Sequence, residues 1–276
     1  MRNFFAVENS SKKEAAAASG YIREYLEKRG CSFTRKSGYL NRNDVPSGTE
    51  CIITLGGDGT MIRVASETCE RGIPIIGVNL GHLGYLTSVK EKEEIPAMLD
   101  ALIADDYSIE NRSMLKGIWE DEDGRHEAVA LNEIVIGRKM TLHAVRLRIS
   151  INGEFLNEYS ADGIIIATPT GSTSYNLSAG GPIVEADSDM MVITPVCPHA
   201  LLPRSIVLTG NNRPKVEVTG GDENGMIVAF DGDVKAQLSI GSCVEIEKAS
   251  HAIRMIRIGR ESFVSNLQKK MEQLQG

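Results

Sequence analysis

A single carboxylate stands inside a glycine-rich turn, the Gly-Gly-Asp-Gly-Thr at residues 56–60. The turn follows the apolar run 51–55 and precedes the amphipathic stretch 61–68, so its backbone N–H groups can face an anion at a helix N-terminus. An acidic side chain beside phosphates is electrostatically costly, which favours a role for Asp58 on a proton or a metal. The structural alternative is a tight turn in which Asp58 only caps the helix. The turn is not a Walker loop, and Ile62 replaces the third glycine of a dinucleotide fingerprint.

A second polar tract, residues 168–182, follows the apolar run 163–167 and is rich in hydroxyls and glycines. Its donors and acceptors suit a polar heterocycle or a sugar, and Tyr175 offers a face for stacking. We therefore expect a nucleoside site here, with a flexible surface loop as the alternative. Asn132 and Glu133 lie inside another apolar strand, where either a ligand sugar or a main-chain network must satisfy them.

The first hundred residues contain the elements that would position the glycine turn. Short apolar runs alternate with longer amphipathic stretches, a pattern typical of a parallel sheet with helical crossovers. Ser10 or Ser11 is expected to cap the first helix, and Gly30 to end it. The predicted strands are 4–8, a strand starting at 31–35, 51–55 and 73–79, and the other predicted helices are 61–68 and 92–104.

From about residue 111 the pattern changes to short β-branched runs separated by turns, such as 145–151 and 226–230. The pairs Asp123-Gly124 and Asn152-Gly153 predict hairpins. These runs favour a mostly antiparallel β domain. We therefore predict an α/β domain with a Rossmann-like parallel sheet and a mostly antiparallel second domain. The first comprises residues 1–105 completed by a C-terminal helix, 261–276, and the second comprises residues 106–260.

The composition restricts the class of protein. With 276 residues, 42% hydrophobic and 24% charged, the chain is typical of a globular protein, which excludes wholesale disorder. A net charge of -7 repels polyanions, so no nucleic-acid partner is expected. The five scattered cysteines suggest neither disulfides nor a zinc site and fit a reducing compartment. The sequence shows no spanning apolar run and no signal-peptide core, so we expect a cytoplasmic protein without a membrane partner.

Taken together, these motifs resemble the NAD kinase family, in its bacterial ATP- or polyphosphate-dependent form. The resemblance rests on the order and spacing of residues 56–60, 79–86, 131–133 and 162–182, and it extends through 199–205 and 230–232. The first motif alone also resembles diacylglycerol and sphingosine kinases and 6-phosphofructokinases. A lipid kinase and a catalytically silent dinucleotide sensor therefore remain alternatives.

The resemblance implies phosphoryl transfer from ATP, or from polyphosphate, to the 2′-hydroxyl of the adenosine ribose of NAD, giving NADP. It implies that Asp58 is the general base, and that a divalent cation, Mg²⁺, travels with the ATP phosphates without metal ligands from the protein. The family fold is an α/β domain joined to a β-sandwich, assembled as a homodimer or homotetramer. The substrate-binding residues that it implies are Gly59, Arg63, Asn132, Glu133, His143, Asp162, Thr173, Ser174, Tyr175, Asn176, Leu177 and Ser178.

Two positions depart from the pattern of bacterial members. Ser160 stands where many of them carry a basic residue, and Asp233 stands where glutamine is common. Lost positive charge and gained negative charge near a dinucleotide alter how it is held. The choice between NAD and NADH, and between ATP and polyphosphate, stays open at this point.

Overall fold

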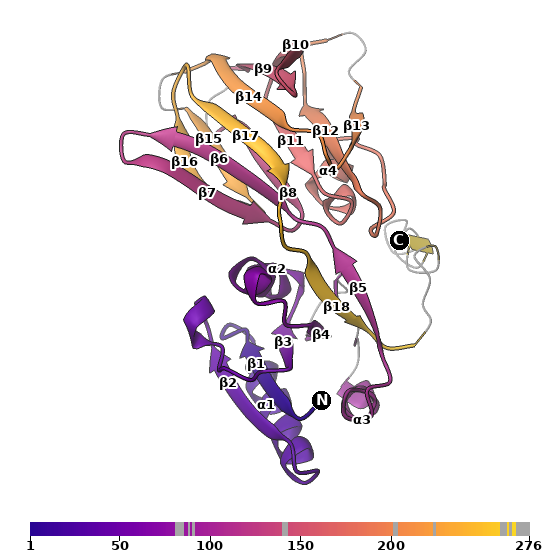
Figure 1. Cartoon of the computed structure of the whole chain (residues 1–276). Helices are drawn as coiled ribbons and strands as arrows, with labels where there is room; N and C mark the ends of the chain where they lie inside the picture. Colours follow the sequence, from indigo (N-terminus) through magenta and orange to yellow (C-terminus); the bar gives the residue numbers. More distant parts are fainter. Residues whose placement is uncertain are drawn as a thin grey trace. The chain divides into compact units, whose positions relative to one another are not determined.

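The structure, a computed structural model, describes residues 1–80, 86–87, 89, 92–139, 143–200, 204–222, 225–259, 264 and 267–268. The chain forms two compact units: unit 1 is Met1–Asn111 with His251–Gly276, and unit 2 is Arg112–Ser250 (Figure 1). The domain boundaries predicted from the sequence are 105/106 and 260/261. In the structure the first division lies after the predicted boundary, at 111/112, and the second lies before it, at 250/251. Both shift because β5 (Ser108–Arg112) and β18 (Ile253–Arg257) join the N-terminal sheet. The predicted helix 261–276 lies outside the described residues, except for 264, 267 and 268.

Unit 1 is a six-stranded sheet, in the order β2-β1-β3-β4-β18-β5, with helices. The pairs β1–β2, β1–β3, β3–β4 and β4–β18 are all parallel. The predicted α/β class is therefore confirmed, and the strands β1, β3 and β4 end at one edge of the sheet. The remaining elements of the unit are β1 (Asn3–Glu8), α1 (Lys13–Glu27), β2 (Ser32–Ser37), η1 (Arg42–Asp44), β3 (Cys51–Gly56), α2 (Asp58–Thr68), η2 (Cys69–Arg71), β4 (Ile75–Asn79), η3 (Lys92–Glu94) and α3 (Ile95–Ile103).

Burial explains why these segments take their places. Strand β3 is buried along its whole length, as its continuous apolar run predicts for the middle of a parallel sheet. Helix α1 buries Ile22 and Leu26, four residues apart, against the sheet. It begins at Lys13 after an N-cap, Lys12, that makes no side-chain cap bond. The predicted Ser10 or Ser11 cap is therefore wrong, because Ser11 bonds to the Asn9 side chain instead.

Unit 2 contains two six-stranded sheets whose registered pairs are all antiparallel, in the orders β10-β9-β14-β17-β6-β7 and β13-β12-β11-β8-β15-β16. Asn152 and Gly153 both have positive φ, 53° and 87°, in the β9–β10 turn, which is the geometry of the hairpin predicted there. The elements are β6 (Leu115–Asp121), β7 (Gly124–Ala130), β8 (Glu133–Arg138), β9 (Val145–Ile151), β10 (Glu154–Ala161), β11 (Gly163–Ala167), η4 (Gly171–Thr173), α4 (Tyr175–Ser178), β12 (Met190–Val196), β13 (Ile206–Thr209), β14 (Pro214–Gly220), β15 (Met226–Phe230), β16 (Asp233–Leu238) and β17 (Cys243–Lys248).

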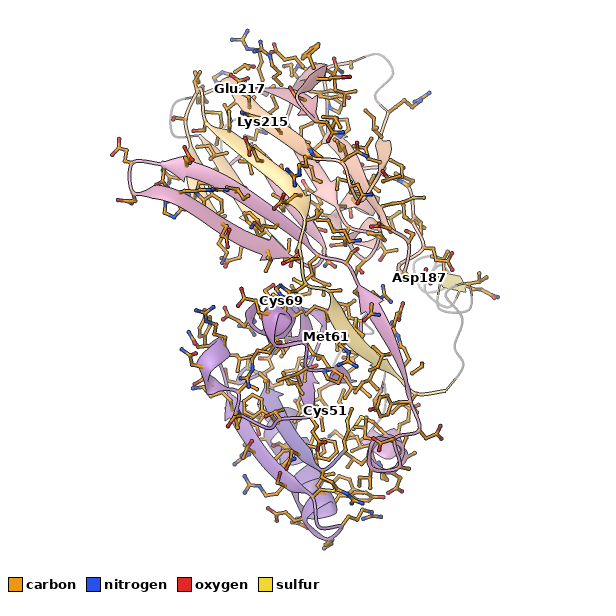
Figure 2. All side chains as sticks on the ribbon, in the orientation of Figure 1. Cys51, Met61, Cys69, Asp187, Lys215 and Glu217 are labelled. Atoms are coloured by element: carbon orange, nitrogen blue, oxygen red, sulfur yellow. The ribbon has the colours of Figure 1, made fainter. Side chains whose placement is uncertain are left out.

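The two sheets of unit 2 share one hydrophobic core. Ile134 and Ile164 from one sheet and Leu147 and Val216 from the other belong to a single buried cluster. Along β14, buried residues alternate with the outward Lys215 and Glu217, which Figure 2 labels. Each sheet thus turns one apolar face inward, and the predicted β-sandwich is confirmed.

All five cysteines are free thiols. Cys51 and Cys69, labelled in Figure 2, are buried in unit 1, and burial raises the pKa of both thiols. Across the described ranges, none of the helices has the length and apolarity needed to cross a membrane.

Candidate functional site

The glycine turn lies where β3 ends and α2 begins, at the carboxyl edge of the unit 1 sheet. Gly57 is extended, with φ -114° and ψ -170°, and Asp58 is the first residue of α2. The carboxylate Oδ1 of Asp58 accepts a hydrogen bond of 3.1 Å from the N–H of Leu86. Asp58 is half-buried, whereas Gly59 and Arg63 are exposed on the first two turns of the helix. These three predicted residues therefore lie together at one helix N-terminus.

The three glycines of this turn serve two purposes. A Cβ on Gly56 would overlap the side chain of Thr60, so glycine is required there for close packing. A Cβ on Gly57 or Gly59 would meet no atom of the described residues within 4 Å. The backbone beside Asp58 is therefore open, as a phosphate approaching the N-terminus of a helix requires.

Neighbouring loops are tied to the turn by hydrogen bonds. The Nδ2 of Asn9, after β1, donates to Oγ1 of Thr60 at 3.3 Å, and the N–H of Leu80, after β4, donates to the carbonyl of Gly56 at 3.0 Å. The Nζ of Lys12 donates to the carbonyl of Leu80 at 2.9 Å. The loops that follow β1, β3 and β4 thus form one connected edge. Residues 81–85 of the motif 79–86 lie outside the described residues.

The sequence predicted that Asn132 and Glu133 lie inside a strand. In unit 2, Glu133 is the first residue of β8, whereas Asn132 precedes the strand. Both are buried, with 8% and 6% of their surface exposed. The carbonyl of Asn132 accepts a hydrogen bond of 2.8 Å from the N–H of Thr168. A Cβ on Gly171 would overlap the backbone of Asn132, so the two segments pack main chain against main chain.

The carboxyl group of Glu133 is only half satisfied. Its Oε1 accepts a hydrogen bond of 3.3 Å from the hydroxyl of Ser174, while Oε2 is buried without a hydrogen-bond partner among the described residues. The pKa of Glu133 is raised from 4.5 to about 7, chiefly by burial and secondly by the charge of Asp231, while the Ser174 hydrogen bond opposes the rise. Such a group favours a bound proton or a ligand donor.

Asp231 anchors the same segment and is not among the predicted site residues. It sits in the β15–β16 turn with φ 49°, and its carboxylate accepts hydrogen bonds from the N–H groups of Leu131 (2.7 Å), Asn132 (2.7 Å) and Glu133 (3.0 Å). Its own N–H donates to the carbonyl of Glu133 at 3.0 Å. The signal was present as an Asp-Gly pair after an apolar strand, which predicts a turn but not what the carboxylate binds.

The polar tract 168–182 forms two short helices, η4 and α4, held by one buried amide. The Nδ2 of Asn176 donates to the carbonyls of Ser172 (3.0 Å) and Pro182 (3.1 Å), and its Oδ1 accepts from the hydroxyl of Thr194 at 2.7 Å. Asn176 is fully buried, so its side chain holds the tract together. Of the other predicted residues here, Tyr175 and Ser178 are exposed, and Thr173, Ser174 and Leu177 are half-buried.

The other two predicted residues of unit 2 lie elsewhere on the sandwich. Asp162 precedes β11, whereas Thr168 follows it, and the strand between them spans roughly 20 Å of extended chain. Asp162 forms an ion pair of 2.8 Å with Arg138, and Nδ1 of His143 lies 3.2 Å from a carboxylate oxygen of Asp222. The structure therefore divides the predicted unit 2 residues into two groups at opposite ends of β11.

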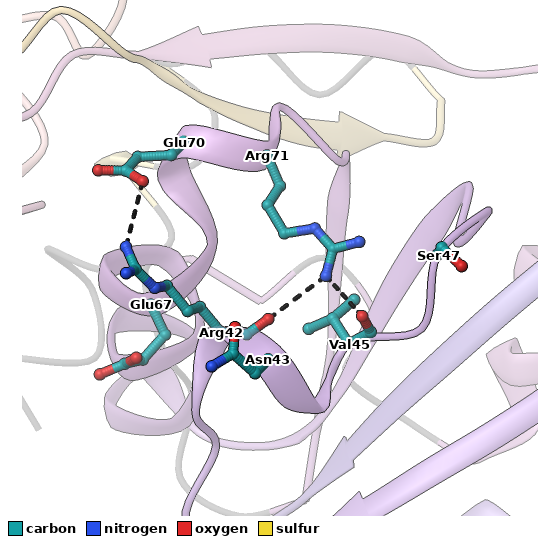
Figure 3. Close-up of a pocket in the computed structure, with 7 residues that line it drawn as sticks. All are labelled: Arg42, Asn43, Val45, Ser47, Glu67, Glu70 and Arg71. Atoms are coloured by element: carbon teal, nitrogen blue, oxygen red, sulfur yellow. Dashed lines mark hydrogen bonds and ion pairs between the residues drawn. The ribbon is translucent and has the colours of Figure 1, made fainter.

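A polar pocket of about 470 Å³ lies at the last turn of α2, roughly 14 Å along the helix from Asp58. Figure 3 shows that Arg42 is bonded to Glu70, and that Arg71 is bonded to the carbonyls of Arg42 and Val45. None of the predicted site residues lines it. The described part of the chain holds no group of three His, Cys, Asp or Glu side chains able to bind a metal ion. The pocket lining is Arg42, Asn43, Val45, Ser47, Glu67, Glu70 and Arg71.

Comparison with known families matches both units. Residues 3–107 match the family model described as the ATP-NAD kinase N-terminal domain, and residues 131–258 match that of the ATP-NAD kinase C-terminal domain. The chain is 40% identical to the NAD kinase of Agathobacter rectalis, over 98% of this chain and 99% of the relative. It is 35% identical to the NAD kinase of Lachnospira eligens, over 98% of this chain and 100% of the relative.

Solved structures share the fold. The yeast NADH kinase complexed with NADH is similar with a TM-score of 0.89 and 21% identity, covering 99% of this chain and 88% of that chain. An NAD kinase from Archaeoglobus fulgidus in complex with ATP is similar with a TM-score of 0.77 and 23% identity, covering 98% of each chain.

Proposed function

The chain belongs to the NAD kinase family of enzymes, and from this premise we propose that it phosphorylates the 2′-hydroxyl of the adenosine ribose of NAD with ATP to make NADP. The observation that carries the proposal is Asp58, a carboxylate on open glycine backbone at the N-terminus of α2. The family match covers both units, which argues against a lipid kinase that shares only the glycine turn.

In the proposed reaction Asp58 acts as general base. The 2′-hydroxyl gives its proton to the Asp58 carboxylate as its oxygen bonds to the terminal phosphorus, and the bond from that phosphorus to the bridging oxygen breaks to release ADP. The hydrogen bond from Leu86 holds one carboxylate oxygen, Oδ1. The open backbone at Gly57 and Gly59 leaves room for the phosphates, and Arg63, on the second turn, adds positive charge nearby.

Unit 2 is proposed to recognise the nucleoside. Asn132 and Glu133 would hold a ribose, because the half-satisfied carboxyl of Glu133 gains from a ligand hydroxyl. The exposed ring of Tyr175 would stack on adenine. Asp162 would contact the amide or sugar end of NAD. The remaining proposed contacts are Thr173, Ser174, Leu177 and Ser178, with Asn176 holding their helix, and His143 at the far end of β11.

The divalent cation is proposed to arrive with ATP. Mg²⁺ bound to the triphosphate would neutralise charge that builds up as the phosphoryl group moves. Polyphosphate as a second donor, assembly as a homodimer or homotetramer, and a cytoplasmic location complete the proposal, and the five free thiols are consistent with that location.

The decisive experiment incubates the purified protein with ATP, MgCl₂ and NAD, with NADH and polyphosphate in parallel, and locates the new phosphate by ³¹P NMR. We expect 2′-phosphorylated NAD, and a loss of about 10²-fold or more in kcat for Asp58→Asn. Asparagine keeps the oxygen that accepts the Leu86 hydrogen bond, so the variant should fold. Binding of NAD without turnover from any donor would identify a silent sensor, and an Asp58→Asn variant with native kcat would exclude Asp58 as the base.

A further inference from the structure

A buried carboxyl group, Glu133, and a half-buried one, Asp231, lie at the start of β8. Glu133 is 6% exposed, and Asp231 comes to it from the β15–β16 turn on the neighbouring strand pair. Neighbouring acids that are partly or fully removed from water are expensive unless each has a defined role. The four backbone hydrogen bonds between Asp231 and residues 131–133 show how Asp231 is accommodated.

We propose that Asp231 is a positioning residue for the kinase reaction: it fixes the main chain of residues 131–133 and thereby directs Asn132 and Glu133 toward the ribose of NAD. The inference rests on the proposed function. It assigns Asp231 no contact with substrate, since the hydrogen bonds of its carboxylate among the described residues are to the main chain.

Burial raises the pKa of Asp231, and the hydrogen bonds that its carboxylate accepts from the main chain oppose that rise. Three N–H donors converge on its two oxygens, and such donors stabilise the charged form. An asparagine would bring an amide N–H toward some of these donors and lose their bonds, although it tolerates the backbone φ of 49°. A glutamate would keep the charge but overshoot by one methylene.

A second effect follows from the charge. Among the described residues, the titratable group that faces Glu133 is Asp231, and the hydrogen-bond donor that faces its side chain is the Ser174 hydroxyl. The negative charge of Asp231 raises the pKa of Glu133 in addition to burial. Neutralising Asp231 should therefore lower the pKa at which Glu133 loses its proton, which a merely structural residue would not do.

The test compares Asp231→Asn and Asp231→Glu with the native enzyme in NADP formation, measuring KM for NAD, KM for ATP and the pH profile of kcat/KM for NAD. For Asp231→Asn we expect KM for NAD to rise about tenfold or more, KM for ATP to change less than about twofold, and the limb of the profile that Glu133→Gln abolishes to move to lower pH. Asp231→Glu should also raise KM for NAD while leaving that limb in place. Asp105→Asn, at an exposed aspartate with φ 58° in unit 1, is the matched control and should change neither.

Native KM for NAD and an unshifted profile in Asp231→Asn would overturn the proposal. Equal losses toward NAD and ATP with no shift in the profile would also overturn it, since they indicate general damage. If Asp231→Asn shows no cooperative thermal transition, Asp231→Glu decides, and native KM for NAD in that variant refutes the positioning role. A native enzyme that makes no NADP would instead refute the proposed function.

Discussion

Two regions of the molecule use similar residues in opposite ways. The first is the glycine turn of unit 1, and the second is the segment 131–133 packed with the tract 168–182 in unit 2. In the first, Gly57 and Gly59 leave the backbone beside Asp58 uncovered. In the second, the main chain of Asn132 occupies the space where a Cβ of Gly171 would lie. Both the nitrogen and the oxygen of the Asn176 side-chain amide are hydrogen-bonded. The first region is open beside Asp58, whereas in the second, the closed region, polar groups hydrogen-bond to the protein itself.

This difference separates two demands of phosphoryl transfer. Phosphates need backbone and charge that they can approach, which an open helix N-terminus supplies. Recognition of a nucleoside needs side chains held in one geometry, which buried hydrogen bonds supply. The exception within the closed region is Oε2 of Glu133, which is buried without a hydrogen-bond partner among the described residues. A ligand that donates a hydrogen bond to this oxygen would offset the free-energy cost of burying it.

The same Gly→Ala change should therefore have opposite effects in the two regions. Gly171→Ala places a methyl into the Asn132 backbone and should lower the free energy of unfolding by about 3 kcal/mol or more. Gly59→Ala adds a methyl in open space within α2 and should raise it by up to about 1 kcal/mol. Denaturant unfolding of both variants measures this contrast.

Gly59→Ala should lower enzymatic activity even though it raises the free energy of unfolding. In the proposed reaction its added methyl would stand where phosphate or ribose approaches, so we expect kcat/KM to fall by about tenfold to a hundredfold in a fully folded variant. A Gly59→Ala protein with native activity would show that the open space is not used. A stable Gly171→Ala protein would show that the segment 131–133 moves aside easily and that the closed region is not rigid.

The Glu133 carboxyl predicts a pH dependence of stability. The native state holds its proton up to about pH 7, whereas the unfolded chain releases it near 4.5. Because the native state binds more protons between these values, the free energy of unfolding should fall as pH rises from 4.5 to 7, by about 3 kcal/mol at most. Glu133→Gln removes this decline and should be more stable than the native protein at pH 8 but not at pH 4.

Burial also raises the pKa of Asp231. In both the native protein and Glu133→Gln, this adds a further decrease of the free energy of unfolding as pH rises. The informative quantity is therefore the difference between the native and Glu133→Gln unfolding curves across pH. A difference that is constant from pH 4 to pH 8 would mean that Glu133 keeps an ordinary pKa and has a partner for Oε2.

Asn176 and Ser178 allow a comparison within one short helix. Asn176→Ala removes the amide that bonds Ser172, Pro182 and Thr194 in the interior and should lower the free energy of unfolding by about 2 kcal/mol. Ser178→Ala, at an exposed hydroxyl, should change it by less than about 0.5 kcal/mol. Thermal unfolding of the two variants distinguishes them, and equal stabilities would mean that the buried amide does not hold the tract.

Periodicity predicted the elements better than it predicted their connections. The strands 145–151, 163–167 and 226–230 match β9, β11 and β15, because alternation and buried apolar runs are local signals. The role of Asp231 was not predictable, since it depends on main-chain donors about a hundred residues away in sequence. The places of β5 and β18 in the N-terminal sheet, and of Asp162 far from Glu133, likewise depend on the topology and not on neighbouring residues.

The smallest expected effect concerns the two ends of α2. Arg63→Ala removes an exposed guanidinium near the glycine turn and should leave the free energy of unfolding within about 0.5 kcal/mol. It should raise KM for ATP several-fold, and by less at high salt because exposed charges are screened. Arg42→Ala, at an exposed arginine of the pocket in Figure 3, is the matched control and should change neither KM. An equal, salt-sensitive rise of KM for ATP in both variants would mean that ATP binding depends on the net charge of the whole unit. The N-terminus of α2 would then not be a specific phosphate-binding site.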